Sequence, residues 1–230
     1  TVRVPHNMTE FGEELKRKIL VAAGARKKLQ NLYRSADLKS TFQKTQVDKK
    51  VLDLTAALNK LVLIGTSTGG PKALHRVIPN LPGNLGAGVL VVQHMPATFT
   101  KAFADRLNSN SKLKVVESKE GDIIEKNVVY VAPGGFHMEV GMDKKIHLNS
   151  EPPIWGVRPA VDKLFLSAAK LYKEKLLSIV LTGMGKDGAE GTIKVKENGG
   201  ITISEDESTC TIYGMPRVAF ETGMVDMVLP

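Results

Sequence analysis

The feature that most constrains the fold is a series of short apolar runs in which apolar and polar residues do not alternate. The runs are LVLI (61–64), GVLVV (88–92), VVYV (128–131), LLSIVL (176–181) and ITIS (201–204). Such runs are typical of strands buried on both faces, as in parallel sheets. Helical stretches are predicted between several of them, at 71–78, 98–108, 159–173 and 188–197. This alternation predicts a layered, doubly wound α/β fold with a largely parallel sheet.

The composition excludes several other classes of protein. No window approaches the roughly 18 uninterrupted apolar residues of a membrane span, so direct membrane insertion is not expected. Cys210 is the only cysteine and has no partner within the chain for a disulfide. No signal peptide is visible, and the expected compartment is the cytoplasm. The segment at about 112–148 is expected to add short strands, with hairpins among them.

The positive charge of the chain is concentrated in its first quarter. The net charge is +8 over 230 residues. Residues 1–60 hold 13 Lys and Arg against 6 Asp and Glu, whereas residues 61–230 hold 19 against 18. The basic region lacks the interleaved aromatic side chains that stack on bases. We therefore expect no nucleic-acid partner.

The N-terminal quarter predicts one helix followed by a linker. Apolar residues recur at steps of three and four over about 9–29, which indicates an amphipathic helix. The stretch at about 30–58 is polar and weakly patterned, as expected of a linker. The chain opens on Thr1 without a methionine, from which we expect that it was processed or cut from a longer chain.

Two predicted strand ends carry residues suited to catalysis. Ligands and catalytic groups gather beyond the carboxyl ends of parallel strands. After the first run, Ser67 lies in Gly65-Thr66-Ser67-Thr68-Gly69, a G-x-S-x-G pattern that exposes a serine on a sharp turn. The same stretch also fits a tight turn whose Ser and Thr cap the next helix. His94 follows the second run and is a candidate catalytic residue. The alternative interpretation is that His94 is a hydrogen-bonded histidine of the core.

The third strand end, TGMGKDGAEG, carries Asp187 and supports two interpretations. Its Gly183-Met184-Gly185-Lys186-Asp187-Gly188 matches the G-x-G-x-x-G of dinucleotide sites, and Glu205 and Asp206 follow about 20 residues later. The loop comes late in the chain, however, and only about 45 residues follow it, too few for the rest of such a domain. Backbone N–H groups of the loop are also suited to bind an oxyanion.

Ser67, His94 and Asp187 together are the residue set of a Ser-His-Asp hydrolase. Their order along the chain differs from the Ser-Asp-His order of α/β-hydrolases, so we predict a Rossmann-like fold of another kind. No two histidines have metal-ligand spacing, and no metal or organic cofactor is expected.

Six segments together resemble the catalytic domain of the chemotaxis-receptor protein-glutamate methylesterase family, in order across about 59–228. They are GTSTGG (65–70), QHMPATFT (93–100), YVAPGGFH (130–137), RPAVDKLF (158–165), LTGMGKDGAEG (181–191) and YGMPRVA (213–219). The resemblance implies that residues 1–28 are the last helix of a receiver domain whose body is absent. It further implies a linker at 29–58 and a catalytic domain at 59–230.

The same resemblance implies roles for individual residues. Ser67 corresponds to the nucleophile, His94 to the base and Asp187 to the acid of the family, and the N–H of Met184 to its oxyanion donor. The N–H of Thr68 at the helix start is a second candidate donor. The implied reaction is hydrolysis of glutamyl γ-methyl esters on the cytoplasmic helices of chemoreceptors, with deamidation of receptor glutamines. A dinucleotide-binding protein and a non-catalytic receptor scaffold remain the alternatives.

Overall fold

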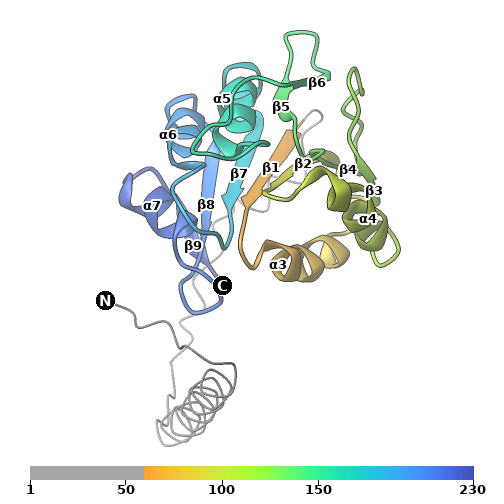
Figure 1. The fold of residues 1–230 in the computed structure, drawn as a ribbon. Coiled ribbons are helices and arrows are strands. Elements are labelled where there is room, and N and C mark those ends of the chain that lie inside the picture. The colour runs from red at the N-terminus through yellow and green to blue at the C-terminus, as the bar shows by residue number, and fades with distance from the viewer. Residues whose placement is uncertain (1–59) are drawn as a thin grey trace, which may run out of the picture. The chain divides into compact units, whose positions relative to one another are not determined.

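The computed structural model describes residues 60–230, so the predicted N-terminal helix and linker lie outside the described residues. Its centre is a seven-stranded sheet in the order β3-β4-β2-β1-β7-β8-β9, in which every neighbouring pair is parallel (Figure 1). The strands are β1 (Lys60–Thr66), β2 (Ala87–Gln93), β3 (Lys114–Glu117), β4 (Val128–Val131), β7 (Leu176–Val180), β8 (Ile201–Glu205) and β9 (Met227–Leu229).

Helices cover both faces of this sheet, as the predicted α/β layering requires. They are α3 (Gly70–Val77), α4 (Ala97–Asn108), α5 (Val161–Tyr172), α6 (Ala189–Glu197) and α7 (Met215–Glu221), with 3-10 turns at Ile78–Asn80 and Lys173–Lys175. Buried side chains of α3 and α4 share one apolar cluster with the sheet, and those of α5, α6 and α7 share the other. The prediction of a doubly wound parallel fold is confirmed.

The apolar runs build both clusters because successive side chains of a strand point to opposite faces. In β1, Leu61 and Leu63 pack on the side of α5, while Ile64 packs on the side of α3. In β2, Leu90 and Val91 divide in the same way, and all four of the leucines and valines at 89–92 are fully buried. A strand with two buried faces shows no alternation, which explains the pattern in the sequence.

The segment at 112–148 contributes to two separate sheets. Its first strands, β3 and β4, extend the main parallel sheet to one edge. Its last two strands, β5 (His137–Val140) and β6 (Ile146–Asn149), pair antiparallel as a hairpin. Sequence reasoning did not anticipate α7 and β9, which have seven and three residues. Elements this short carry too few residues to show a period.

The strand order decides which loops meet at the carboxyl edge of the sheet. β1 lies between β2 and β7, so the loops that follow these three strands are neighbours. They are the loops with Ser67, His94 and Asp187. Within residues 60–230, no helix has both the length and the apolar character needed to cross a bilayer.

Candidate functional site

Ser67 lies in the turn between β1 and α3, where the backbone packs closely against the side chains of Val161 and Gln93. A Cβ on Gly65 would lie 2.3 Å from Cγ1 of Val161, and one on Gly70 would lie 2.0 Å from Oε1 of Gln93. Gly69 has a φ of 86°, in the left-handed region. No side chain caps α3, so the alternative in which Ser or Thr caps this helix is wrong. The glycines allow the turn, and Ser67 is half-buried within it.

His94 and Asp187 are in direct contact. Nε2 of His94 lies 2.8 Å from Oδ2 of Asp187, and their side chains are 9% and 2% exposed. An ionised carboxylate only accepts hydrogen bonds, so the imidazole donates through Nε2. This leaves Nδ1 of His94 as the ring nitrogen with a free lone pair. The arrangement fixes both the tautomer and the orientation of the ring.

Ser67 shares a groove with His94 but does not hydrogen-bond to it in the described structure. Both residues line a groove of about 700 Å³. The Gln93 amide joins the two loops, because its Nε2 donates to the carbonyl oxygens of Ser67 and His94, at 3.0 Å each. The N–H of His94 also donates to the carbonyl of Thr66, at 3.1 Å. Hydrogen bonds between nucleophile and base are often longer in a free enzyme than in its substrate complex.

Asp187 lies at the beginning of α5 and accepts hydrogen bonds from its backbone. The N–H of Val161 donates to Oδ2 at 2.6 Å, and the N–H of Asp162 donates to Oδ1 at 2.8 Å. Both N–H groups belong to the first turn of the helix, where the dipole favours a negative charge. The two backbone donors therefore fix the position of the Asp187 carboxylate at the start of α5.

Asp162 makes the reciprocal arrangement with α6. Its Oδ1 accepts from the N–H groups of Gly188 and Gly191, at 3.0 and 2.8 Å, and its Oδ2 accepts from Nε1 of Trp155 at 3.1 Å. Burial raises the pKa of Asp162 to about 6, against the hydrogen bond from Gly191 that lowers it, and the charge of Asp187 raises it further. The two helices thus exchange carboxylates at their N-termini: Asp187 lies at the start of α5, and Asp162 lies at the start of α6.

Thr182 connects the loops that follow β1, β7 and β8. Its carbonyl accepts from the N–H of Ser67 at 3.0 Å, and its hydroxyl donates to the carbonyl of Thr68 at 2.9 Å. The same hydroxyl accepts from the N–H groups of Thr211 and Ile212, at 3.1 and 3.0 Å. These bonds hold the three loops in a fixed arrangement around Ser67.

The two candidate oxyanion donors have unoccupied N–H groups. Among the described residues, neither the N–H of Thr68 nor that of Met184 donates a hydrogen bond to protein, whereas the N–H of Ser67 is used by Thr182. Gly183 brings the second loop against the nucleophile, because a Cβ there would lie 2.9 Å from Cβ of Ser67. Two free donors beside a serine are suited to stabilise an oxyanion.

Lys186 contacts an aromatic ring and forms no ion pair with Asp187 among the described residues. Its ammonium lies 3.6 Å from the ring centroid of Trp155, a cation–π contact. Trp155 is in turn fixed by its hydrogen bond to Asp162. The hydrogen-bond partners of the Asp187 carboxylate within residues 60–230 are therefore His94 and the two backbone groups of α5.

The structure argues against the dinucleotide interpretation of the loop at 183–188. In such sites a pyrophosphate occupies the N-terminus of the helix after the glycines. Here the Asp162 carboxylate already accepts the N–H groups of Gly188 and Gly191 at that position. Glu205 is 8% exposed and accepts the N–H of Thr182 at 2.7 Å, so it is not free to bind a ribose.

Two other described histidines, His137 and His147, lie outside this groove. His137 is buried and bonds to the carbonyl of Pro152 and the N–H of Ala160. His147 lies at the surface between Glu120 and Asp143. In the part of the chain that the structure describes, no three His, Cys, Asp or Glu side chains gather in a way that would hold a metal ion.

The fold and the candidate site define a class: a doubly wound α/β protein with the residue set of a serine hydrolase at the carboxyl edge of its sheet. A family model described as CheB methylesterase matches residues 62–230. The chain belongs to the CheB methylesterase family. The resemblance predicted from the six sequence segments is confirmed.

Relatives and a solved structure agree with this membership. A protein-glutamate methylesterase/protein-glutamine glutaminase of Clostridium acetobutylicum is 63% identical over 169 residues, 74% of this chain and 49% of that protein. One of the same name from Pyrococcus abyssi is 46% identical over 227 residues, 97% of this chain and 60% of that protein. The crystal structure of the Thermotoga maritima CheB methylesterase catalytic domain matches with a TM-score of 0.73 and 47% identity. It covers 76% of this chain and 94% of that one.

The chain spans about half to three fifths of the length of these two curated relatives. Sequence reasoning located the three candidate catalytic residues but missed the residues that position them. Gln93 is next to His94, and its place as a polar residue directly after the apolar run 88–92 was the available signal. Asp162 lies in the segment RPAVDKLF (158–165), and an Asp in the first turn after Pro159 was the signal for a role at a helix N-terminus.

Proposed function

We propose that this chain is the catalytic part of a serine-type protein-glutamate methylesterase, which hydrolyses glutamyl γ-methyl esters on chemoreceptors and also deamidates receptor glutamines. The single observation that carries the proposal is the Nε2 to Oδ2 contact of His94 and Asp187, 2.8 Å long, beside a groove that Ser67 also lines. The names of the Clostridium and Pyrococcus relatives state both activities.

In the acylation step, Oγ of Ser67 attacks the ester carbonyl and His94 takes its proton on Nδ1. Asp187 stays ionised and stabilises the imidazolium through Nε2. The N–H groups of Met184 and Thr68 donate to the oxyanion, and each such donor contributes about 10²–10³ in rate. The intermediate then collapses: the carbon–methoxy bond breaks, and His94 gives its proton to the departing oxygen, which leaves as methanol.

In the deacylation step, water takes the place of methanol. His94 removes a proton from the water, whose oxygen attacks the acyl carbon in the same oxyanion site. The bond to Ser67 breaks and the serine recovers its proton from His94. The product is the glutamyl carboxylic acid, which releases its proton to solvent and leaves as the carboxylate. With glutamine as substrate, the same sequence releases ammonia in place of methanol.

The proposal includes an organisation of the chain and its setting. Residues 59–230 form the catalytic domain, 29–58 the linker, and 1–28 the last helix of a receiver domain that acts on the catalytic domain in cis. The partners are the methylated cytoplasmic helices of chemoreceptors, and the compartment is the cytoplasm. The match of the family model to 62–230 supports the first of these boundaries.

The test is mass spectrometry of a methylated receptor fragment after incubation with the chain. We expect each modified glutamyl residue to lose the mass of one methylene group and each reactive glutamine to gain the mass difference between amide and acid. His94→Ala abolishes both changes, whereas His147→Ala, at the surface hairpin, leaves both. Receptor binding without either mass change would instead identify a non-catalytic scaffold.

A further inference from the structure

The groove that Ser67 and His94 line continues between two helices, away from the reacting atoms. Its walls include Lys72 of α3 and Arg106 of α4. Its apolar surface includes Phe99, Ala102 and Phe103, all from α4. Phe99 is 59% exposed and adds apolar surface to the groove. The shape and lining are suited to an amphipathic helix laid along α4.

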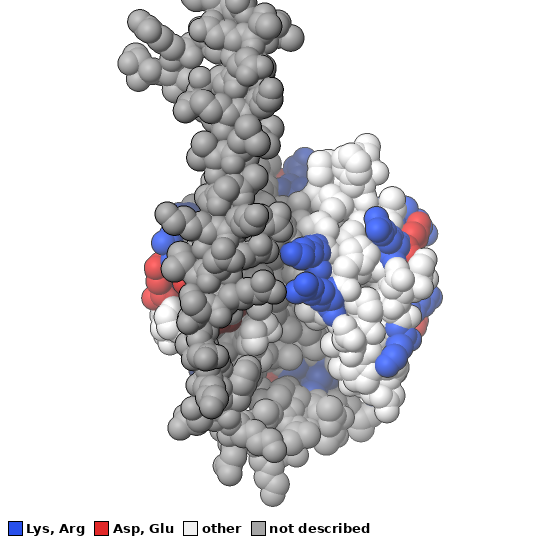
Figure 2. Space-filling view, turned by 90° about the horizontal axis from the view of Figure 1, so that it is seen from below, with Lys and Arg blue, Asp and Glu red and all other residues white. Residues whose placement is uncertain are grey.

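The charge of this groove has one sign. None of its lining residues is Asp or Glu. Neither Lys72 nor Arg106 forms an ion pair with another described residue, although neighbouring Asp105 pairs with Lys101. In Figure 2, which shows the molecule from the side of α3, blue Lys and Arg side chains stand out on the coloured part of the surface and red ones are few. An unpaired cation beside an apolar groove favours an anionic ligand.

His75 does not add to this charge. Its ring lies edge-on to Phe103, with 5.7 Å between the ring centroids. Burial lowers the pKa of His75, and the charge of Arg106 lowers it further, so the ring is neutral at pH 7. Lys72 and Arg106 are therefore the cations of the groove. They differ in reach: Lys72 is in the first turn of α3, close to Ser67, while Arg106 is in the last turn of α4.

We propose that the groove between α3 and α4 is a substrate-recognition site in which Lys72 and Arg106 bind carboxylates of an acidic amphipathic helix that carries the ester. This inference rests on the proposed function and names the chemistry that selects its substrate. α4 rises about 1.5 Å per residue, so Arg106 is about 14 Å along the helix from Ala97. A substrate helix presents the same face once per turn of about 5.4 Å. We assign Lys72 to a carboxylate one turn from the ester and Arg106 to one two turns away, about 11 Å, the remaining distance being within the reach of the long arginine side chain.

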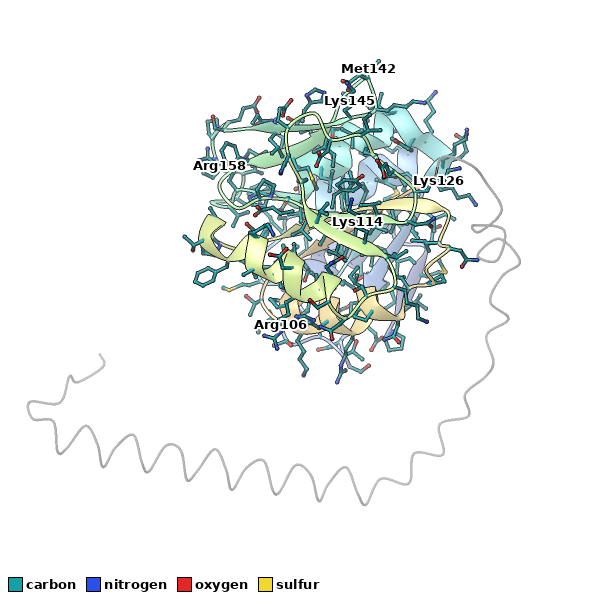
Figure 3. The ribbon with its side chains drawn as sticks, turned by 90° about the vertical axis from the view of Figure 1, so that its right-hand side faces the viewer. Arg106, Lys114, Lys126, Met142, Lys145 and Arg158 are labelled. Atoms are coloured by element: carbon teal, nitrogen blue, oxygen red, sulfur yellow. The ribbon has the colours of Figure 1, made fainter. Side chains whose placement is uncertain are left out.

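The experiment measures methanol release by the whole chain from helical peptides with a single glutamyl methyl ester. One peptide carries Glu seven positions from the ester, and its partner carries Met there, which is similar in length and uncharged. A second pair places the same residues four positions away. Each placement is made on both sides of the ester. The variants are Arg106→Gln, Lys72→Gln and the control Lys126→Gln, which Figure 3 shows well away from Arg106.

We expect Arg106→Gln to raise KM for the seven-position Glu peptide by about threefold to fivefold, the value of a partly exposed charge pair. The KM for the Met peptide stays as in the parent chain, which makes the effect a coupling between Arg106 and the carboxylate. Lys72→Gln acts in the same way on the four-position pair. Lys126→Gln changes neither.

Equal KM values for Glu and Met peptides at every placement would overturn the proposal, as would an effect of Arg106→Gln on both peptides alike. Either result, with methanol still released, leaves the proposed function standing and assigns the groove to another occupant, such as an acidic face of the receiver domain. If the parent chain releases no methanol from any peptide or receptor, the proposed function fails instead.

Discussion

At the scale of single residues, Asp187 has two kinds of partner, and both depend on its charge. It orients His94, and it accepts two N–H groups at the beginning of α5. An asparagine at 187 has the same shape, but one of its two terminal atoms is an NH₂ group, which donates hydrogen bonds. That NH₂ group would face one of the N–H donors that now bind the carboxylate, and the hydrogen bond there would be lost. The same substitution should therefore reduce activity and stability together.

Asp187→Asn is expected to lower kcat by about 10³–10⁴, because the amide selects the wrong tautomer of the base. It also weakens the N-terminus of α5 by about 1–2 kcal/mol, which lowers the melting temperature. Methanol release and thermal unfolding measure the two effects. The matched control is Asp143→Asn on the exposed hairpin. Activity of Asp187→Asn within tenfold of the parent would contradict the role of this carboxylate.

Asp162 makes the stability depend on pH in an unusual direction. Its folded pKa, about 6, is above its ordinary value of 3.8, so the folded state binds the proton more tightly than the unfolded state. The stabilisation is fully present below about pH 4 and is lost as the pH rises through about 6. Relative to Asp162→Asn, the parent should lose on the order of 2–3 kcal/mol over this range. The measurement is the free energy of unfolding of the parent and of Asp162→Asn from pH 4 to pH 8. A difference between the two proteins that does not change with pH would refute this prediction.

The sequence predicted which residues are candidates for chemistry but not how they are supported. Ser67, His94 and Asp187 each follow a recognisable strand, so their meeting at one edge was predictable. The use of Nε2 rather than Nδ1 by His94 depends on side-chain rotation, which no spacing encodes. Likewise, Asp162 is 25 residues from Asp187 in sequence, and their exchange of helix ends is visible only in three dimensions.

At the scale of elements, the loop after β7 must approach the turn after β1 very closely. Gly183 lies where they meet: an added Cβ would be 2.3 Å from Sδ of Met215 and 2.9 Å from Cβ of Ser67. The loop is also fixed by Thr182 on one side. A side chain at 183 therefore displaces Met215 and either the candidate oxyanion loop or the nucleophile.

Gly183→Ala is expected to reduce kcat/KM about 10²-fold, the cost of misplacing reacting groups by about 1 Å. Gly83→Ala is the control, since a Cβ there meets nothing closer than 3.6 Å. Unfolding curves of both variants correct the rates for the folded fraction. Parent-like turnover by Gly183→Ala would show that this contact does not position the site.

The elements themselves were predictable where they were long. Helices α4, α5 and α6 begin within two residues of the predicted starts, and all five apolar runs are strands of the main sheet. The edge strands β3 and β9 have four and three residues. Their placement is determined by pairing with β4 and β8 rather than by their own pattern.

At the scale of the whole molecule, residues 60–230 contain both apolar clusters that enclose the sheet. We therefore expect residues 59–230 alone to fold and to keep the esterase activity, because every residue in the proposed mechanism is within them. The measurement is a thermal unfolding curve together with methanol release, compared with the whole chain. An unfolded fragment, or a loss of more than tenfold in rate, would contradict the proposed domain boundary.

For the whole molecule, the sequence predicted the net charge but not where the charged side chains lie on the surface. The count of 19 basic and 18 acidic residues over 61–230 gives a nearly neutral catalytic part. It does not show that the groove beside Ser67 is lined by Lys72 and Arg106 without a carboxylate. The distribution depends on which side chains the helices turn toward each other, and only the fold determines that.

The most direct test of the proposed mechanism is methanol release from a methylated chemoreceptor fragment by the parent chain, Ser67→Ala and the control Ser109→Ala. Ser109 is an exposed serine at the end of α4. If Ser67 is the nucleophile, the parent and Ser109→Ala release methanol steadily, and Ser67→Ala, with an unfolding curve that matches the parent, releases none above background. Undiminished release by Ser67→Ala would contradict the assignment of Ser67 as nucleophile.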